Sequence, residues 1–187
     1  MKKTIISVFF VIIALLTPRV LHAEGIAGQS ATISYSLFTD NKCTVAVNYA
    51  KKKRVIETVL KKYNSPLVRN ADDFIAACQT YHMNCYLLPA ITGLESSFGQ
   101  FTWPGSHNPF GWGGGYIMFK DWSEGITTVA QGLHDNYIQK GADDLYSIGP
   151  IYSESPTWAV RVERFMNEMQ REEDNLQLFL SDNQVQL

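Results

Sequence analysis

The chain has 187 residues, of which 18 are acidic and 16 are lysine or arginine. This length accommodates one domain and excludes two large ones. The slightly acidic balance argues against nucleic acid as the main partner, because binding to phosphates requires a surplus of basic side chains. The same balance is compatible with an uncharged sugar polymer as the partner.

Residues 1–23 have the organisation of a secretory signal peptide. Lys2 and Lys3 precede an apolar run over residues 4–16, and Ala23 provides a small residue for cleavage. The alternative is an uncleaved membrane anchor, but the run is shorter than the roughly 20 residues that a span requires. We therefore expect cleavage near Ala23, no stable membrane anchor afterwards, and a secreted or periplasmic protein at the cell wall.

The chain after Ala23 divides into two segments of different pattern. Residues 24–48 are rich in Gly, Ser and Thr and show no helical period, so we expect a loose lead-in there, with at most one strand at 31–38. From Tyr49 onward, apolar residues recur at helical spacing. This pattern predicts a folded domain over residues 49–187.

The first half of this domain contains three predicted helices. The first stops at the Asn-Ser-Pro sequence of residues 64–66 and carries an apolar stripe that consists of Val55, Ile56, Val59 and Leu60. The second covers about residues 71–82. The third starts at 85–88 with Pro89 in its first turn, and Gly99 is expected to end it as a C-cap.

The second half combines a glycine-rich segment with two further predicted helices. Residues 109–112 and 116–119 are expected to pair as a small β-hairpin around three consecutive glycines. A fourth helix is expected between Trp122 and Gly141, and a last helix opens with Pro156 at its first position. The tail after it is polar, with Leu176, Phe179 and Leu180 able to fold back. The predicted fold class is therefore mainly α (α+β), a helical domain with one small hairpin.

Three cysteines follow the predicted cleavage site: Cys43, Cys78 and Cys85. Export permits a disulfide between Cys78 and Cys85, which flank a predicted turn, and Cys43 is then the odd thiol. Three reduced, partly buried cysteines are the alternative. No Cys-x-x-Cys or His-Glu-x-x-His sequence occurs, and the histidines are not paired at metal spacing, so we expect neither a metal nor a cofactor.

Glu95 is the first candidate for a catalytic group. It follows Ile91 by four residues and Leu94 by one, so it lies on or beside the buried face of the third helix, near the end of that helix. Apolar surroundings and the helix C-terminus raise the pKa of a carboxyl and keep it protonated, as a glycosidase general acid requires. A solvated or salt-bridged glutamate at the border of this face is the alternative.

Eight aromatic residues lie between positions 98 and 122. Aromatic rings bind the apolar C–H face of a pyranose, so this density indicates a sugar-binding surface. The alternative is that some of these rings form the core of the hairpin, as Phe119 and Trp122 beside the fourth helix are expected to do.

Five segments, in this order, resemble the lysozyme-like superfamily: residues 64–67 (NSPL), 87–99 (LLPAITGLESSFG), 108–113 (NPFGWG), 119–126 (FKDWSEGI) and 151–159 (IYSESPTWA). Within it they are most similar to the endo-β-N-acetylglucosaminidases of flagellar and autolysin type. The resemblance implies a lysozyme-like fold and a bacterial peptidoglycan hydrolase. It also implies that Glu95 is the general acid, that Tyr152 lies in the cleft, and that Ser96 supports the glutamate. The chain lacks the Gly-Leu-Met-Gln stretch of lytic transglycosylases, which favours hydrolysis.

The second catalytic group is open at this point. Glu124 matches best in position for a base or nucleophile, but it also forms a capping box with Asp121 at a helix start. Glu154 is a further candidate, and the acetamido group of the substrate would remove the need for either carboxylate. The expected substrate-binding residues are Ser96, Phe98, Trp103, Asn108, Phe110 and Trp112.

These patterns together predict a monomeric, exported glycoside hydrolase. Its partner is expected to be the glycan strands of peptidoglycan, in which it cleaves β-1,4 bonds between N-acetylated sugars. Two alternatives stay open: a lytic transglycosylase that leaves anhydro-muramyl ends, and a non-catalytic glycan-binding protein on the same fold.

Overall fold

The computed structural model describes residues 41–182, and this part of the chain is mainly helical, which confirms the predicted fold class. Its α-helices are α3 (Asn41–Lys62), α4 (Ala71–Tyr81), α5 (Leu87–Ser96), α6 (Trp122–Asn136), α7 (Leu145–Tyr152) and α8 (Trp158–Asp182). Short 3₁₀-helices lie between them: η2 (Pro66–Asn70), η3 (Trp112–Gly115) and η4 (Ile138–Lys140). The predicted signal peptide at 1–23 and strand at 31–38 lie outside the described residues.

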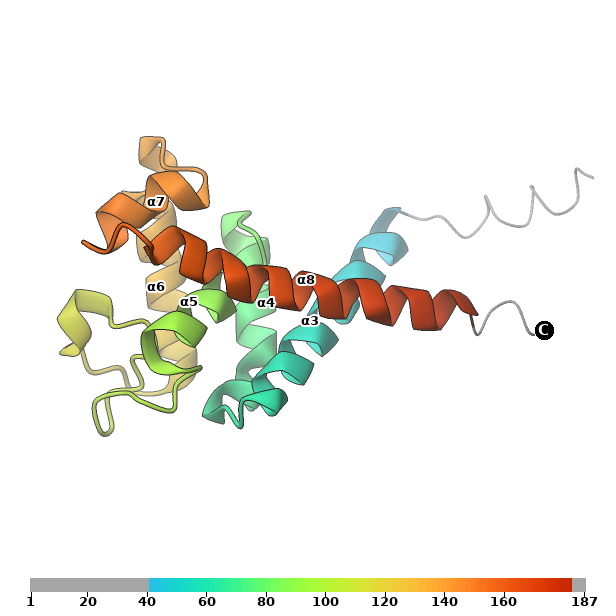
Figure 1. Cartoon of the computed structure of the whole chain (residues 1–187), viewed down its shortest axis with the longest axis horizontal. Coiled ribbons are helices and arrows are strands. Elements are labelled where there is room, and N and C mark those ends of the chain that lie inside the picture. Colours follow the sequence, from blue (N-terminus) through green and yellow to red (C-terminus); the bar gives the residue numbers. More distant parts are fainter. Residues whose placement is uncertain (1–40, 183–187) are drawn as a thin grey trace, which may run out of the picture. The chain divides into compact units, whose positions relative to one another are not determined.

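The core is built around α5, nearly all of whose residues are buried. The long helix α8 packs against α5, α3 and α7, and it crosses the view of Figure 1 in red. Helix α4 packs against α3 and α6. Because α5 is enclosed by α8 and by the segments that follow α5, the glutamate in its last turn is held by elements distant in sequence.

The predicted end of the first helix is confirmed, because α3 ends at Lys62, Asn64 takes a left-handed conformation with φ of 49°, and Ser65 then caps η2. Ser65 Oγ accepts a hydrogen bond from the Leu67 amide at 3.0 Å and donates one to the Phe98 carbonyl at 2.7 Å. The apolar stripe that precedes it is buried, as expected: Val55, Ile56, Val59 and Leu60. The Asn-Ser-Pro sequence thus ends α3 and also fixes the segment after α5.

Helix α3 begins at Asn41, so the predicted lead-in over 24–48 extends too far. Residues 45–48 are helical but exposed. A helical turn without a buried face does not need apolar residues at helical spacing. The spacing therefore predicted a helical domain only from Tyr49 onward.

The expectation that Gly99 caps the third helix is wrong. Helix α5 ends at Ser96, and Ser97 and Phe98 take left-handed conformations with φ of 50° and 59°. The Phe98 ring then folds back onto the helix, where a Cβ atom on Gly93 would lie 2.7 Å from it. Burial of this ring stabilises two backbone conformations that non-glycine residues rarely adopt.

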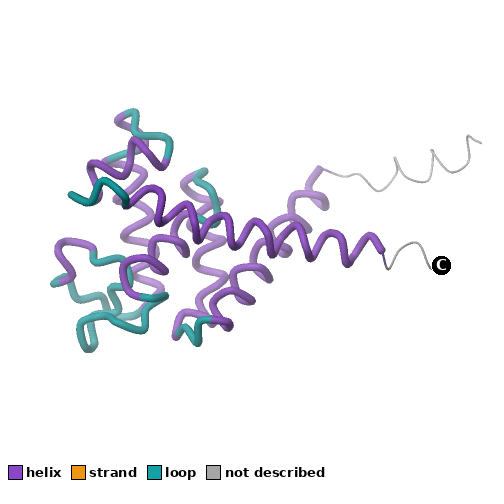
Figure 2. The backbone as a smooth tube through the Cα atoms, in the orientation of Figure 1, coloured by secondary structure: helices purple, strands orange, loops and turns teal. Residues whose placement is uncertain are grey.

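The predicted hairpin over 109–119 is also wrong, because the described residues contain no strand and this segment is loop and short helix (Figure 2). The Asn108 side chain donates to the carbonyls of Trp112 and Ile117 and accepts from the Trp112 amide. It therefore occupies backbone groups that a strand pair would have used. Gly113 and Gly114, with φ of 61° and 73°, close the turn of η3 instead.

Two helical segments near the C-terminus were not predicted. Helix α7 contains Gly149 and Pro150, residues that usually interrupt helices, and Asp144 starts it with a capping box to Ser147. Helix α8 continues to Asp182 rather than folding back. Its second half has a narrow buried side, with Met169 and Glu173 as buried members, so its polar composition concealed the helix.

Cys78 and Cys85 form a disulfide between the end of α4 and the start of α5. This pairing is the first of the two alternatives for these cysteines. In the described part of the chain, no helix is both long and apolar enough to cross a membrane.

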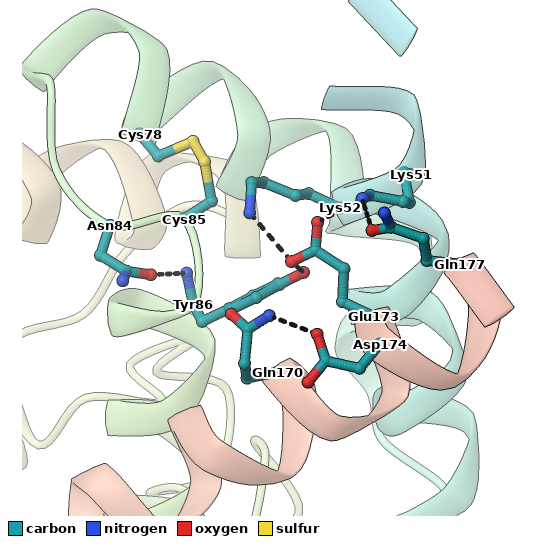
Figure 3. Close-up of polar contacts among 10 residues, drawn as sticks. All are labelled: Lys51, Lys52, Cys78, Asn84, Cys85, Tyr86, Gln170, Glu173, Asp174 and Gln177. Atoms are coloured by element: carbon teal, nitrogen blue, oxygen red, sulfur yellow. Dashed lines mark hydrogen bonds and ion pairs between the residues drawn. A yellow bond between two sulfur atoms is a disulfide. The ribbon is translucent and has the colours of Figure 1, made fainter. Parts of the chain in front are cut away.

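A buried carboxylate connects α8 to α3 and to the start of α5 (Figure 3). Glu173 is 5% exposed and accepts hydrogen bonds from Tyr86 Oη at 2.8 Å and Lys52 Nζ at 3.0 Å. Lys51 Nζ lies 3.1 Å from its other oxygen. Burial alone would raise the pKa of Glu173, but these three partners outweigh it and lower that pKa.

We expect Glu173→Gln to lower the free energy of unfolding near neutral pH by about 1.5–3 kcal/mol, the range for hydrogen bonds to charged groups. Because the folded-state pKa is lowered, this contribution is present above the ordinary glutamate pKa of about 4.3 and is lost as pH falls through the folded value. Urea unfolding at neutral and acidic pH measures the difference, which should shrink in acid. Asp72→Asn, which removes an exposed partner of Lys53, is the control and should cost less than about 1 kcal/mol.

Candidate active site

Glu95 lies in the last turn of α5 and is held by a tryptophan from α8. The Trp158 Nε1 donates a hydrogen bond to Glu95 Oε1 at 2.7 Å. The other carboxylate oxygen, Oε2, faces Gly111, where an added Cβ atom would lie 3.7 Å from it. Gly111 has a φ of 62°, a conformation that favours glycine, so the loop passes the carboxylate without a side chain. One oxygen is therefore fixed, while the side chain as a whole is exposed to solvent.

Tyr152, the last residue of α7, lies next to the same tryptophan. Its ring stacks on Trp158 with centroids 4.7 Å apart, and its hydroxyl donates to the Phe110 carbonyl at 2.7 Å. Because Phe110 precedes Gly111, this bond fixes the loop beside Glu95. Burial, and after it the charge of Glu95, raises the pKa of Tyr152 well above its usual value, so the hydroxyl stays protonated.

An open pocket of about 310 Å³ is lined by Gly111, Trp112, Gly113, Gly114, Tyr137 and Tyr152. Glu95 does not line it, but Gly111 and Tyr152 belong both to the pocket and to the surroundings of the glutamate. The centroid of the Trp112 ring lies 6.1 Å from that of Tyr137 and 5.9 Å from that of Tyr152. Gly132 in α6 allows this packing, because a Cβ atom there would lie 2.6 Å from the indole. Three rings around an open pocket provide flat apolar faces that suit a pyranose ring.

The pKa of Glu95 is raised above its ordinary value, in the predicted direction. Partial desolvation is the largest cause, and the Trp158 hydrogen bond and the charge of Arg161 oppose it. The side chain lies beside the apolar face rather than on it, since it is exposed. The arrangement is a carboxyl with an increased tendency to hold a proton, next to an aromatic pocket. The described residues contain no cluster of His, Cys, Asp and Glu that could hold a metal ion.

Four of the predicted substrate-binding residues are buried. Phe98 and Phe110 are fully buried in the core, so their prediction as sugar-contacting rings is wrong. Ser96 Oγ donates to the Pro109 carbonyl at 2.7 Å and accepts from the Gly99 amide, and Asn108 organises the loop as described above. Sequence alone did not separate rings that face the core from rings that face solvent.

The other two predicted substrate-binding residues are accessible but differ in place. Trp112 lines the pocket. Trp103 is exposed on the loop between α5 and α6 and does not belong to the lining of that pocket. A contact between Trp103 and substrate stays a prediction.

Glu124 has the structural role that was the alternative to catalysis. Its carboxylate accepts a hydrogen bond from the Lys120 amide, and its own amide donates to Asp121 Oδ1 at 2.9 Å. The two residues together cap the start of α6. Glu154 is exposed and lines a different pocket, with Tyr146 and Pro156. Neither carboxylate is among the groups that perturb the pKa of Glu95.

Three residues of the site were not predicted as such. Trp158 and Tyr137 each lie on the apolar stripe of a predicted helix, which indicates packing in the core and gives no sign of a site. Arg161 follows Trp158 by one helical turn, so the two neighbour each other on α8. No local signal connects these positions with Glu95, because 63 residues separate the glutamate from Trp158.

No known protein-family model matches this sequence, and a search of curated proteins finds no match either.

Trp158→Phe is expected to raise the pKa of Glu95 further. The phenyl ring keeps a stacking partner for Tyr152 but removes the N–H that favours the charged carboxylate. Titration of the glutamate side-chain carbons by NMR measures this shift. Trp122→Phe is the control, since the Trp122 ring packs against His107 instead. An unchanged or lowered pKa of Glu95 in Trp158→Phe would contradict the assigned role of the indole.

Proposed function

We propose that this protein is an exported glycoside hydrolase that cleaves β-1,4 bonds between N-acetylated sugars in peptidoglycan, with Glu95 as the general acid. The observation that carries the proposal is a partly desolvated carboxyl, fixed at one oxygen by Trp158, beside an open pocket with three aromatic rings. The resemblance of the sequence to lysozyme-like glucosaminidases supports the same assignment.

In this mechanism each group has a separate task. The rings of Trp112, Tyr137 and Tyr152 hold a sugar by its apolar face, and protonated Glu95 donates its proton to the glycosidic oxygen as the C–O bond breaks. Trp158 positions the carboxyl. The missing side chain at Gly111 leaves space for the leaving oxygen to approach Oε2.

The nucleophile is proposed to come from the substrate. Glu124 caps a helix and Glu154 lines another pocket, so neither is a suitable second carboxylate. The acetamido oxygen of the sugar attacks C1 as the leaving group departs with the Glu95 proton. Water then opens the cyclic intermediate and returns a proton to Glu95. Such a reaction requires that the sugar whose C1 forms the cleaved bond carries a 2-acetamido group.

The single carboxylate also favours a second candidate reaction. In a lytic transglycosylase, Glu95 first donates a proton to the leaving oxygen and then removes one from the sugar's own 6-hydroxyl, which closes an anhydro ring. No water is consumed, so the product lacks a reducing end. The chemical difference between the products therefore separates the two reactions.

The proposed location is the periplasm or the cell exterior. The Cys78–Cys85 disulfide supports it, because disulfides persist mainly in oxidising compartments. The N-terminal signal-like sequence supports it as well.

Digestion of purified peptidoglycan, followed by mass spectrometry of the fragments, tests this proposal. We expect fragments with reducing N-acetylglucosamine ends from the native protein and none from Glu95→Gln. Anhydro-muramyl ends would assign the transglycosylase reaction. Wall binding of equal strength by both proteins without any fragments would overturn an enzymatic role in favour of glycan binding.

A further inference from the structure

The loop between α5 and α6 is uncharged up to its last two residues, Lys120 and Asp121, which precede α6 and pair with each other at 3.6 Å. Residues 96–119 contain no Asp, Glu, Lys or Arg. Five large apolar side chains on this loop are exposed: Phe101 (75%), Trp103 (64%), Tyr116 (79%), Ile117 (40%) and Met118 (57%). We call these five residues the loop face. Exposed apolar side chains in such number on one segment mark an interaction surface.

The two ends of the loop that carry these residues lie side by side. The Phe119 amide donates to the Ser106 carbonyl at 2.8 Å. The Met118 methyl lies 4.0 Å from the position of a Cβ atom on Gly105. The Ser106 amide in turn donates to the Trp103 carbonyl, so the loop segments that carry Trp103 and Met118 are neighbours.

Four polar side chains of the same loop are buried or bonded to backbone groups: those of Gln100, Ser106, His107 and Asn108. Ser106 and Asn108 are 0% and 3% exposed, and Asn108 is bonded to loop backbone. The His107 ring pairs with the Phe119 carbonyl, and Gln100 donates to the Tyr63 carbonyl. A sugar site needs polar side chains beside its rings to bind hydroxyl groups. The loop face offers only the Trp103 N–H and the Tyr116 hydroxyl, whereas the pocket shares Gly111 and Tyr152 with the surroundings of the Glu95 carboxylate.

We propose that the loop face is a peripheral membrane-binding surface that inserts its aromatic and apolar side chains into the interfacial layer of a lipid bilayer. Trp and Tyr rings favour this layer, where one end of the ring is apolar and the other hydrated. An uncharged surface enters it without desolvating an ion. The proposal is independent of the glycosidase assignment, because none of the five residues lines the pocket beside Glu95.

Binding to phosphatidylcholine vesicles, and to vesicles that also contain phosphatidylglycerol, tests the proposal by co-sedimentation. We compare the exported protein with Phe101→Ser/Tyr116→Ser and with the control Tyr146→Ser, which removes an exposed aromatic ring on α7. All three share the same N-terminal residues, so a difference between them reports on the loop. Thermal melting verifies that each variant is folded.

We expect the native protein and Tyr146→Ser to bind both vesicle types. The double variant should bind them with an affinity that is lower by about tenfold or more. Raising the salt concentration should change this binding little, because the loop face carries no charge. Absence of native binding, equal binding of all three proteins, or binding abolished by salt would overturn the proposal. It would also be overturned if the double variant kept vesicle binding and lost binding to N-acetylglucosamine oligomers, which would assign the loop face to glycan.

Discussion

Glu95→Gln is expected to lower the rate of glycan cleavage by about 10²–10⁴-fold, the usual contribution of a general acid. Glutamine has the same shape and still accepts the Trp158 hydrogen bond, so the fold and the pocket should be retained. It has no proton of suitable acidity to donate to the leaving oxygen. The release of reducing ends from purified peptidoglycan, measured against protein concentration, gives the rate ratio.

The matched control for this experiment is Glu124→Gln. Glu124 caps α6, so its loss should lower stability by about 0.3–1.5 kcal/mol and leave the cleavage rate nearly unchanged. A fall in rate as large as that of Glu95→Gln would instead identify Glu124 as the second catalytic carboxylate. A native rate in Glu95→Gln would remove Glu95 from the mechanism.

The pH dependence of the native enzyme follows from the same residue. The active form of Glu95 is protonated, and its pKa is raised by desolvation. Activity should therefore persist above the ordinary glutamate range and decline as pH rises through the raised pKa.

Phe98→Ala is expected to lower the free energy of unfolding by about 3–5 kcal/mol, as for other buried phenylalanines. The ring is fully buried, 4.5 Å from the Tyr63 ring and 5.2 Å from the Phe165 ring between centroids. It also closes the space above Gly93 and stabilises the left-handed backbone after α5. Loss of the ring leaves a cavity next to the helix that carries Glu95.

Urea unfolding of Phe98→Ala beside Phe101→Ala measures this effect with a matched residue type. Phe101 is 75% exposed, so its truncation should change stability by no more than about 0.5 kcal/mol. Equal effects of the two substitutions would contradict the burial of Phe98. A Phe98→Ala protein of native stability with weakened glycan binding would restore the sugar-contacting role expected from sequence.

Helices with a buried stripe could be predicted from the sequence. The positions of Val55, Ile56, Val59 and Leu60 recur at the helical period, and burial of one helical face requires this spacing. The cap at Glu124 could also be predicted, because its partners Lys120 and Asp121 lie within four residues of it in the sequence. The position of Glu95 near the end of its helix was also local information.

Elements without such a local signal were missed or predicted wrongly. Residues 45–48 are helical without a buried face, and α7 contains a glycine and a proline that propensity assigns to turns. The segment at 109–119 has the composition of a hairpin. The Asn108 side chain instead forms hydrogen bonds with the backbone of Trp112, and these bonds replace the pairing of a hairpin.

The candidate site itself was determined partly by sequence and partly by tertiary structure. Residue type and spacing selected Glu95 and Trp112, through a carboxyl near an apolar face and a cluster of aromatic residues. The resemblance to lysozyme-like proteins selected Tyr152. Only the tertiary structure placed Trp158 on the carboxyl, turned Phe98 into the core, and left Phe101 in solvent. Local periodicity constrains neighbours within one or two turns, whereas contacts across the fold depend on how complete helices pack.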